Sequence, residues 1–233
     1  MDKSKIEHYG DELYNALITR TAVAPLTDRE ADITIEDAYQ IQQRMIQRRL
    51  DAGETIIGKK IGVTSKVVMD MLKVNQPDFG MMTSGMVFNE GESIDTSTMI
   101  APRAEAEVAF VLKSDLMGPG VTAADVLRAT DFVVPCFEIV DSRIQDWKIK
   151  IQDTVADNAS CGVLVLGGRR KSPADIDLAL AGMVLEKNGE IISTSTGAAV
   201  QGSPVNAVAW LANTLGKLGI SLKAGEVILS GSQ

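Results

Sequence analysis

Residues 103–112 read Arg-Ala-Glu-Ala-Glu-Val-Ala-Phe-Val-Leu, so that two acidic residues run directly into an apolar segment. The composition predicts a β-strand, in which side chains alternate between two faces. Glu105 and Glu107 then point the same way, with Cα atoms roughly 7 Å apart. Two carboxylates on one face of an apolar strand repel each other and are costly to bury. The stretch therefore favours a site for a hard divalent cation bound by oxygen ligands, the alternative being a solvated strand face.

A third carboxylate, Glu138, lies within the apolar, strongly β-prone run 133–140. A charge inside such a strand is rarely left unpaired. Glu138 would complete a set of three carboxylates with the two glutamates of 103–112 and leave positions for water or substrate oxygens, as Mg²⁺ prefers. The alternative is an ion pair with a basic residue such as Arg103 or Arg143.

Lys59 and Lys60 stand side by side in a glycine-flanked predicted strand, residues 55–64. Neighbouring side chains face opposite sides of a strand, so one lysine must face each side. An inward lysine can bind an anionic group of a substrate, or act as an acid or base with a lowered pKa. Alternatively, both lysines reach water. Asp78 is a further candidate, although it can equally be a turn residue.

The composition excludes several classes of function. The 233 residues are 45% hydrophobic and 23% charged, which indicates one large globular domain. The net charge of −8 makes nucleic acid a poor partner, because affinity for it comes from neutralised phosphates. No signal peptide and no apolar stretch of about 18 residues is found, so we expect a cytoplasmic protein with no membrane partner.

The few cysteines and the single histidine restrict the chemistry further. Cys136 and Cys161 are too far apart for a metal or redox motif and are expected to be buried free thiols. His8 falls in the predicted N-terminal helix as a surface residue, so a Ser/His or Cys/His nucleophile is nearly excluded. Acid and base work must fall to Lys, Asp, Glu or metal-bound water.

The pattern along the chain predicts an N-terminal helical region, residues 1–54, and a β-rich domain, residues 55–233. Helices are expected at 2–20, 34–53, 65–73, 122–130 and 203–218, and strands at 55–64, 85–89, 104–113, 133–141, 161–166, 181–186, 191–194 and 227–229. Residues 76–80 read as a turn or loop, and 145–159 are ambiguous. We therefore expect an α+β fold whose mixed or antiparallel sheet can close as a barrel.

Six segments carry a resemblance to a known family. They are 58–65 (Gly-Lys-Lys-Ile-Gly-Val-Thr-Ser), 76–80 (Gln-Pro-Asp-Phe-Gly), 102–107 (Pro-Arg-Ala-Glu-Ala-Glu), 137–143 (Phe-Glu-Ile-Val-Asp-Ser-Arg), 155–160 (Val-Ala-Asp-Asn-Ala-Ser) and 202–211 (Gly-Ser-Pro-Val-Asn-Ala-Val-Ala-Trp-Leu). The chain resembles, over essentially its whole length, the hydratase/decarboxylase family of the fumarylacetoacetate hydrolase superfamily. Segment 76–80 looks like the form found in 2-hydroxypenta-2,4-dienoate hydratases (2-oxopent-4-enoate hydratases) of bacterial meta-cleavage pathways for aromatic compounds.

The resemblance implies the C-terminal-domain fold of that superfamily and a metal site. Glu105, Glu107 and Glu138 would bind Mg²⁺ or Mn²⁺, and the metal would chelate a small 2-oxo or 2-hydroxy dienoate. Lys60 and Asp78 would transfer protons and activate water. The product would be 4-hydroxy-2-oxopentanoate. Related hydrolases activate water with a glutamate–histidine pair, and this chain has no histidine for that purpose.

Further expectations come from the same resemblance. Ser160 and Arg143 would bind substrate. The protein would be a homo-oligomer and could form a complex with 4-oxalocrotonate decarboxylase. A decarboxylase of that kind, or a non-catalytic subunit supporting one, are the alternative functions. Family members continue past the segment matching 229–232, so the chain is expected to lack the last strands of its sheet.

Overall fold

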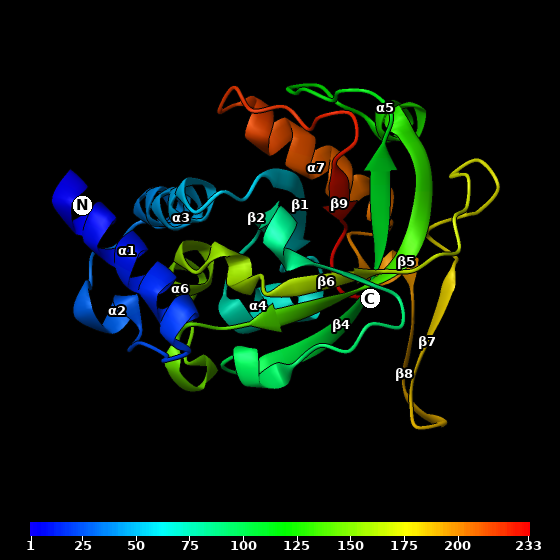
Figure 1. Ribbon diagram of the computed structural model, residues 1–233. Helices are drawn as coiled ribbons and strands as arrows, with labels where there is room; N and C mark the ends of the chain where they lie inside the picture. Colours follow the sequence, from blue (N-terminus) through cyan, green and yellow to red (C-terminus); the bar gives the residue numbers. More distant parts are fainter.

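The computed structural model describes residues 1–233, and the segment rich in glutamate forms the middle strand of a seven-stranded sheet (Figure 1). The helices are α1 (Lys3–Thr19), α2 (Leu26–Arg29), α3 (Ile35–Asp51), α4 (Lys66–Leu72), α5 (Ala123–Ala129), α6 (Ile151–Ala156) and α7 (Pro204–Gly216). The strands are β1 (Ile56–Gly62), β2 (Asp78–Thr83), β3 (Val87–Asn89), β4 (Pro102–Leu112), β5 (Thr130–Asp141), β6 (Val163–Leu166), β7 (Gly182–Lys187), β8 (Glu190–Thr196) and β9 (Val227–Leu229).

The sheet is mixed and runs in the order β2-β1-β9-β4-β5-β6-β3. The pairs β1–β9 and β3–β6 are parallel, and the other neighbours are antiparallel. The long antiparallel pair β4–β5 forms the middle of the curled sheet, and β2 and β3 are its edges. The expected α+β class with a mixed sheet and N-terminal helices is confirmed.

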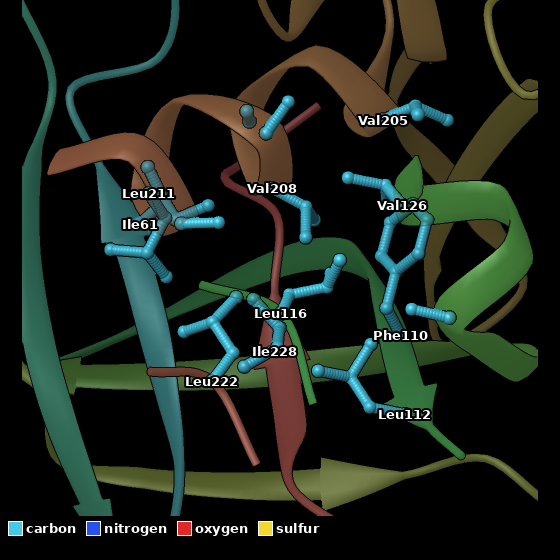
Figure 2. Packing of buried hydrophobic residues seen from close by; sticks show 14 of the residues in the cluster. Ile61, Phe110, Leu112, Leu116, Val126, Val205, Val208, Leu211, Leu222 and Ile228 are labelled. Carbon is cyan, nitrogen blue, oxygen red and sulfur yellow. The ribbon is translucent and has the colours of Figure 1, made fainter. Parts of the chain in front are cut away.

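The main hydrophobic core lies between the sheet and the helices α5 and α7 (Figure 2). Phe110 and Leu112 of β4 meet Val126 of α5 and Val208 and Leu211 of α7 there, all of them buried. Because β4 places its first half at the glutamates and its second half in this core, the core fixes the strand that carries the candidate site.

The N-terminal helices α1 and α3 form a second apolar cluster on the opposite side of the molecule from the β7–β8 hairpin (Figure 1). Thr34 and Asp37 open α3 with a capping box, in which each side chain accepts a hydrogen bond from the other residue's backbone N–H. Ile144, Val155 and Ala156 join the cluster, so residues that follow the sheet complete the helical layer.

Two segments differ from the expectation or extend it. Residues 78–83 form β2 rather than a loop, with Asp78 opposite Gly62 and Gly80 opposite Lys60 in the antiparallel ladder with β1. Proline and glycine suggested a turn locally, but the pairing with β1 overrides that preference. The ambiguous stretch 145–159 contains α6 and two short 3₁₀ turns.

The remaining strands, β7 and β8, pair only with each other and stand apart from the main sheet (Figure 1). Their turn contains Asn188 and Gly189, both with positive φ, which is typical of a two-residue hairpin turn. Ile191 and Ile192 on this hairpin are 64% and 59% exposed. A search of the helices for a long apolar segment that could cross a bilayer finds none.

Candidate active site

Three carboxylates meet on one face of the β4–β5 pair. Glu105 lies directly opposite Glu138 in the antiparallel register, and Glu107 follows two residues along the same face. One oxygen from each side chain can be chosen so that all three lie within 4.8 Å of one another. Glu107 is 4% exposed and Glu138 is fully buried, so the solvated strand face considered above is wrong.

The oxygens of this cluster lack the partners that buried carboxylates normally have. Oε2 of Glu107 accepts a hydrogen bond from the backbone N–H of Gly231 at 2.7 Å, but its Oε1 has no hydrogen-bond partner. Neither oxygen of Glu138 has one. Buried oxygens of Glu107 and Glu138 without hydrogen bonds, close to a carboxylate oxygen of Glu105, fit a cation such as Mg²⁺ or Mn²⁺, which binds oxygen ligands.

The pKa shifts in the cluster also favour a bound cation. Burial raises the pKa of Glu107 well above its ordinary value, and the charges of Glu138 and Glu105 add to the effect. Burial also raises the pKa of Glu138 to about 7, against the opposing influence of Lys60. The site is therefore short of positive charge, and a divalent cation would supply it.

Lys60 supplies the one positive side chain that contacts this cluster. Its Nζ lies 3.3 Å from Oε1 of Glu138, and the residue is 3% exposed. Lys59 faces the other side of the sheet, where its Nζ lies 2.6 Å from Glu226. The predicted alternation is confirmed, and the alternative that both lysines reach water is wrong. Glu138 pairs with Lys60 rather than with Arg103 or Arg143.

The protonation of Lys60 differs from the expectation of a lowered pKa. Burial lowers it, but the carboxylates of Glu138 and Asp78 outweigh burial, so that the pKa of Lys60 is raised. The side chain is therefore an ammonium group among acids. It can donate a hydrogen bond or a proton, whereas base chemistry falls to a carboxylate.

Asp78 lies at the start of β2 and is 2% exposed. Burial raises the pKa of its carboxyl group, and the charge of Lys60 opposes that rise. Its Oδ1 has no hydrogen-bond partner and would lie 2.2 Å from a Cβ placed on Gly62, so only glycine leaves room for it. An unpartnered buried carboxyl is suited to accept a proton.

A cavity of about 280 Å³ brings most of the predicted site residues together. Lys60, Asp78, Glu105 and Ser160 line it from β1, β2, β4 and a 3₁₀ turn, and Val68 and Leu72 of α4 form an apolar wall. The hydroxyl of Ser160 lies 3.4 Å from that of Thr154. A larger cavity of about 570 Å³ also reaches Asp78. Polar groups at one end and apolar side chains at the other suit a short organic acid.

Three predicted site residues do not line this cavity: Glu107 and Glu138, which lie beside Glu105 in the carboxylate cluster, and Arg143. Arg143 is fully buried, and its guanidinium donates hydrogen bonds to Asp157 and to the carbonyl oxygens of Asp157 and Cys161. Its predicted contact with substrate stays a prediction.

Two other residues near the cavity had no decisive signal in the sequence. Trp147 lines the cavity, and Arg103 lies over its ring with the guanidinium carbon 4.3 Å from the ring centroid. Asn158 sits in the wall behind Asp78 and binds β2 through its amide. Cys136 and Cys161 are buried free thiols and His8 is exposed, as predicted.

Comparison with known proteins agrees with this fold. Residues 59–233 match the family model "Fumarylacetoacetate (FAA) hydrolase C-terminal". The chain belongs to the fumarylacetoacetate hydrolase family.

Its similar curated relatives within that family are hydratases. A 2-hydroxypent-2,4-dienoate hydratase of Pseudomonas putida is 64% identical over 222 residues, 95% of this chain and 100% of the relative. A 2-hydroxyhexa-2,4-dienoate hydratase of Comamonas testosteroni is 60% identical, over 99% of this chain and 88% of the relative.

A solved structure resembles the chain throughout. It is 4-oxalocrotonate decarboxylase from Pseudomonas putida G7, complexed with magnesium and adipate, with a TM-score of 0.97 and 35% identity. The match covers 100% of this chain and 88% of the decarboxylase.

Proposed function

We propose that this protein is a hydro-lyase that adds water to 2-hydroxypenta-2,4-dienoate (2-oxopent-4-enoate) to give 4-hydroxy-2-oxopentanoate, in the meta-cleavage degradation of aromatic compounds. The observation that carries the proposal is a cavity lined by Lys60, Asp78 and Glu105, with Glu105 belonging to the cluster of three carboxylates. The curated relatives at 64% and 60% identity act as hydratases of such dienoates by name, which supports this substrate class.

Glu105, Glu107 and Glu138 would hold Mg²⁺ or Mn²⁺, and the solved decarboxylase in complex with magnesium supports that assignment. A bound cation of this kind acts as a Lewis acid toward the carboxylate and 2-oxo oxygens of the substrate. Glu105 of this cluster and the apolar side chains of α4 line the same cavity, so a substrate held at the cation would have its hydrocarbon end near α4.

The remaining steps belong to the side chains. Lys60, as an ammonium group, donates a hydrogen bond or a proton where negative charge develops on the dienol. Loss of the proton from the 2-hydroxyl group and protonation at C5 together convert the dienol to its isomer, the 2-oxo-3-enoate. Asp78 accepts a proton from water as its oxygen adds to C4, and a proton delivered to C3 completes the addition of one water molecule. Ser160 orients the substrate from the facing wall.

The direct test uses purified protein with 2-hydroxypenta-2,4-dienoate, with and without Mg²⁺, and follows the loss of dienol absorbance. Metal-dependent loss is expected. Release of CO₂ from 2-oxohex-3-enedioate without dienol turnover would favour decarboxylation, the activity named for the solved relative. Inertness toward both substrates would favour a non-catalytic subunit.

We also propose a cytoplasmic homo-oligomer that can associate with 4-oxalocrotonate decarboxylase. The exposed apolar residues Val184, Ile191 and Ile192 of the β7–β8 hairpin support self-association, because apolar surface of this kind marks interfaces. Light scattering of the purified protein, alone and mixed with the decarboxylase, checks both parts. A monomer that does not bind the decarboxylase would contradict them.

A further inference from the structure

The wall of the cavity that carries Ser160 has an unusual backbone. Asn158, Ala159 and Ser160 have φ values of 54°, 51° and 53°, so three consecutive residues other than glycine adopt the left-handed conformation. This conformation is unfavourable for L-amino acids, and consecutive examples persist only where the surroundings enforce them. Ala159 and Ser160 both line the cavity, so this left-handed turn, residues 158–160, decides where the Ser160 hydroxyl points.

Arg143 donates hydrogen bonds to the residues that flank the left-handed turn on both sides. On the near side, its Nε and one terminal nitrogen donate to the carboxylate and the carbonyl oxygen of Asp157, and its backbone N–H donates to the same carboxylate at 2.9 Å. On the far side, its Nη1 donates to the carbonyl oxygen of Cys161 at 2.8 Å. Arg143 and Asp157 are both fully buried. A planar, rigid fork is needed to reach these acceptors together, which lysine cannot supply.

The turn is also fixed to the strand that carries Asp78. The amide of Asn158 accepts from the backbone N–H of Met81 at 2.8 Å and donates to the Met81 carbonyl at 2.9 Å. The Asn158 carbonyl packs on Gly80, where a Cβ would lie only 2.4 Å away. One movement of the turn would therefore displace both Ser160 and the β2 backbone next to Asp78.

We propose that Arg143 and Asp157 are positioning residues, which act through the left-handed turn to place Ser160 and Asp78 against the substrate. This inference rests on the proposed hydration. It gives Arg143 a role without contact to substrate, in agreement with its absence from the cavity lining. Misplacement of reacting groups by about 1 Å can cost about 10²-fold in rate, so the pair matters for turnover beyond its part in folding.

The first test compares Asp157→Asn and Arg143→Lys with the wild type. Each substitution keeps much of the side-chain volume but weakens the hydrogen bonds that hold the turn. We expect kcat to fall by about 10- to 100-fold while the affinity for Mg²⁺ stays within about twofold, because the carboxylate cluster is untouched. Arg49→Lys is the matched control: Arg49 is buried and donates to Glu54 and Thr83, away from the turn, so its kcat should stay at the wild-type value.

A double-mutant cycle separates positioning from general damage. If Asp157 acts in part through Ser160, Asp157→Asn should cost clearly less in a Ser160→Ala background than the roughly tenfold or more that it costs alone, the remaining loss being the part exerted through Asp78. Fully additive losses, or an unchanged kcat in both single variants, would overturn the proposal. A wild-type enzyme that does not hydrate the dienoate would instead contradict the proposed function.

Ala159→Gly provides a variant that keeps every hydrogen bond of the turn and removes only the Ala159 methyl group. Glycine adopts the left-handed conformation freely, so this variant should fold at least as well as the wild type. We expect a lower kcat because the turn is less constrained, with an unchanged thermal midpoint or a higher one. Wild-type kcat in Ala159→Gly would show that the backbone constraint has no part in positioning.

Discussion

Without metal, the carboxylate cluster should destabilise the folded protein, whereas with bound metal it should stabilise it. The variant Glu107→Gln should separate these two effects. Ligand oxygens of Glu107 and its two neighbours lie within 4.8 Å, and each ionised pair at that distance costs about 3.5 kcal/mol at an effective dielectric constant of 20. If one carboxylate takes up a proton, this repulsion is avoided, but keeping a carboxyl of ordinary pKa 4.5 protonated at pH 7 itself costs about 3.4 kcal/mol. Removing one acid should therefore recover a large part of this free energy.

The glutamine side chain fits the same place. Its oxygen can still accept the hydrogen bond from the backbone N–H of Gly231, and its amide nitrogen can donate to a neighbouring carboxylate. We expect the metal-free variant to be about 2 kcal/mol more stable than the metal-free wild type. For a chain of this size that corresponds to a thermal midpoint about 4–8 °C higher.

With Mg²⁺ added, the wild type should become the more stable of the two proteins. Mg²⁺ at 100 times its Kd should stabilise the wild type by about 2.7 kcal/mol, whereas the variant, with one ligand lost, should gain little. Thermal unfolding in EDTA and in Mg²⁺, followed by circular dichroism, measures both effects. A variant that is less stable than the wild type in EDTA, or that keeps the full stabilisation by Mg²⁺, would refute the reasoning.

The affinity of the wild type for Mg²⁺ should rise with pH up to about 7, because burial raises the pKa of Glu138 to that value and protons compete with the cation below it; calorimetric titrations at pH 6 and pH 8 that give equal Kd values would contradict this. In the metal-free protein the same raised pKa makes folding less favourable at higher pH. The folded state holds more protons than the unfolded state between pH 4.5 and about 7, so the free energy of unfolding in EDTA should fall as pH rises through that window. A free energy of unfolding that rises there would contradict the reasoning. Lys60→Met should lower kcat by about 10²–10⁴-fold in the dienol absorbance assay, and near-wild-type turnover would exclude Lys60 from proton transfer. Phe110→Ala should destabilise the fold by about 3–5 kcal/mol in urea unfolding, and a loss below about 1 kcal/mol would show that the core of β4 tolerates a cavity.

The sequence was sufficient to predict the carboxylate cluster, because two simple patterns determine it. Strand alternation puts Glu105 and Glu107 on one face, and a charge within an apolar run identifies Glu138. The missing information was the register. Only the folded sheet shows that Glu138 lies directly opposite Glu105, since the pairing of two strands depends on the whole surface they bury.

Asp78 and the turn around Ser160 were harder to predict for a different reason. Residues 76–80 contain proline and glycine and read as a turn, but β1 draws them into a strand, and Gly80 is present to admit the Asn158 carbonyl. Residues 157–160 read as a polar loop. Their left-handed conformation is imposed by Arg143, which is distant in the sequence and gives no local signal.

The exposure of helix α4 affects how substrate reaches the cavity. It supplies the apolar wall over the site, yet none of its seven residues is buried, and Val67 and Met71 are 78% and 70% exposed. Its local opening free energy should therefore be far below that of the β4–β5 pair, whose core residues make most of the apolar contacts. Amide hydrogens of α4 should exchange with solvent long before those of β4. Substrate can then enter and product can leave through brief local unfolding of α4, while the strands that hold the carboxylates stay intact.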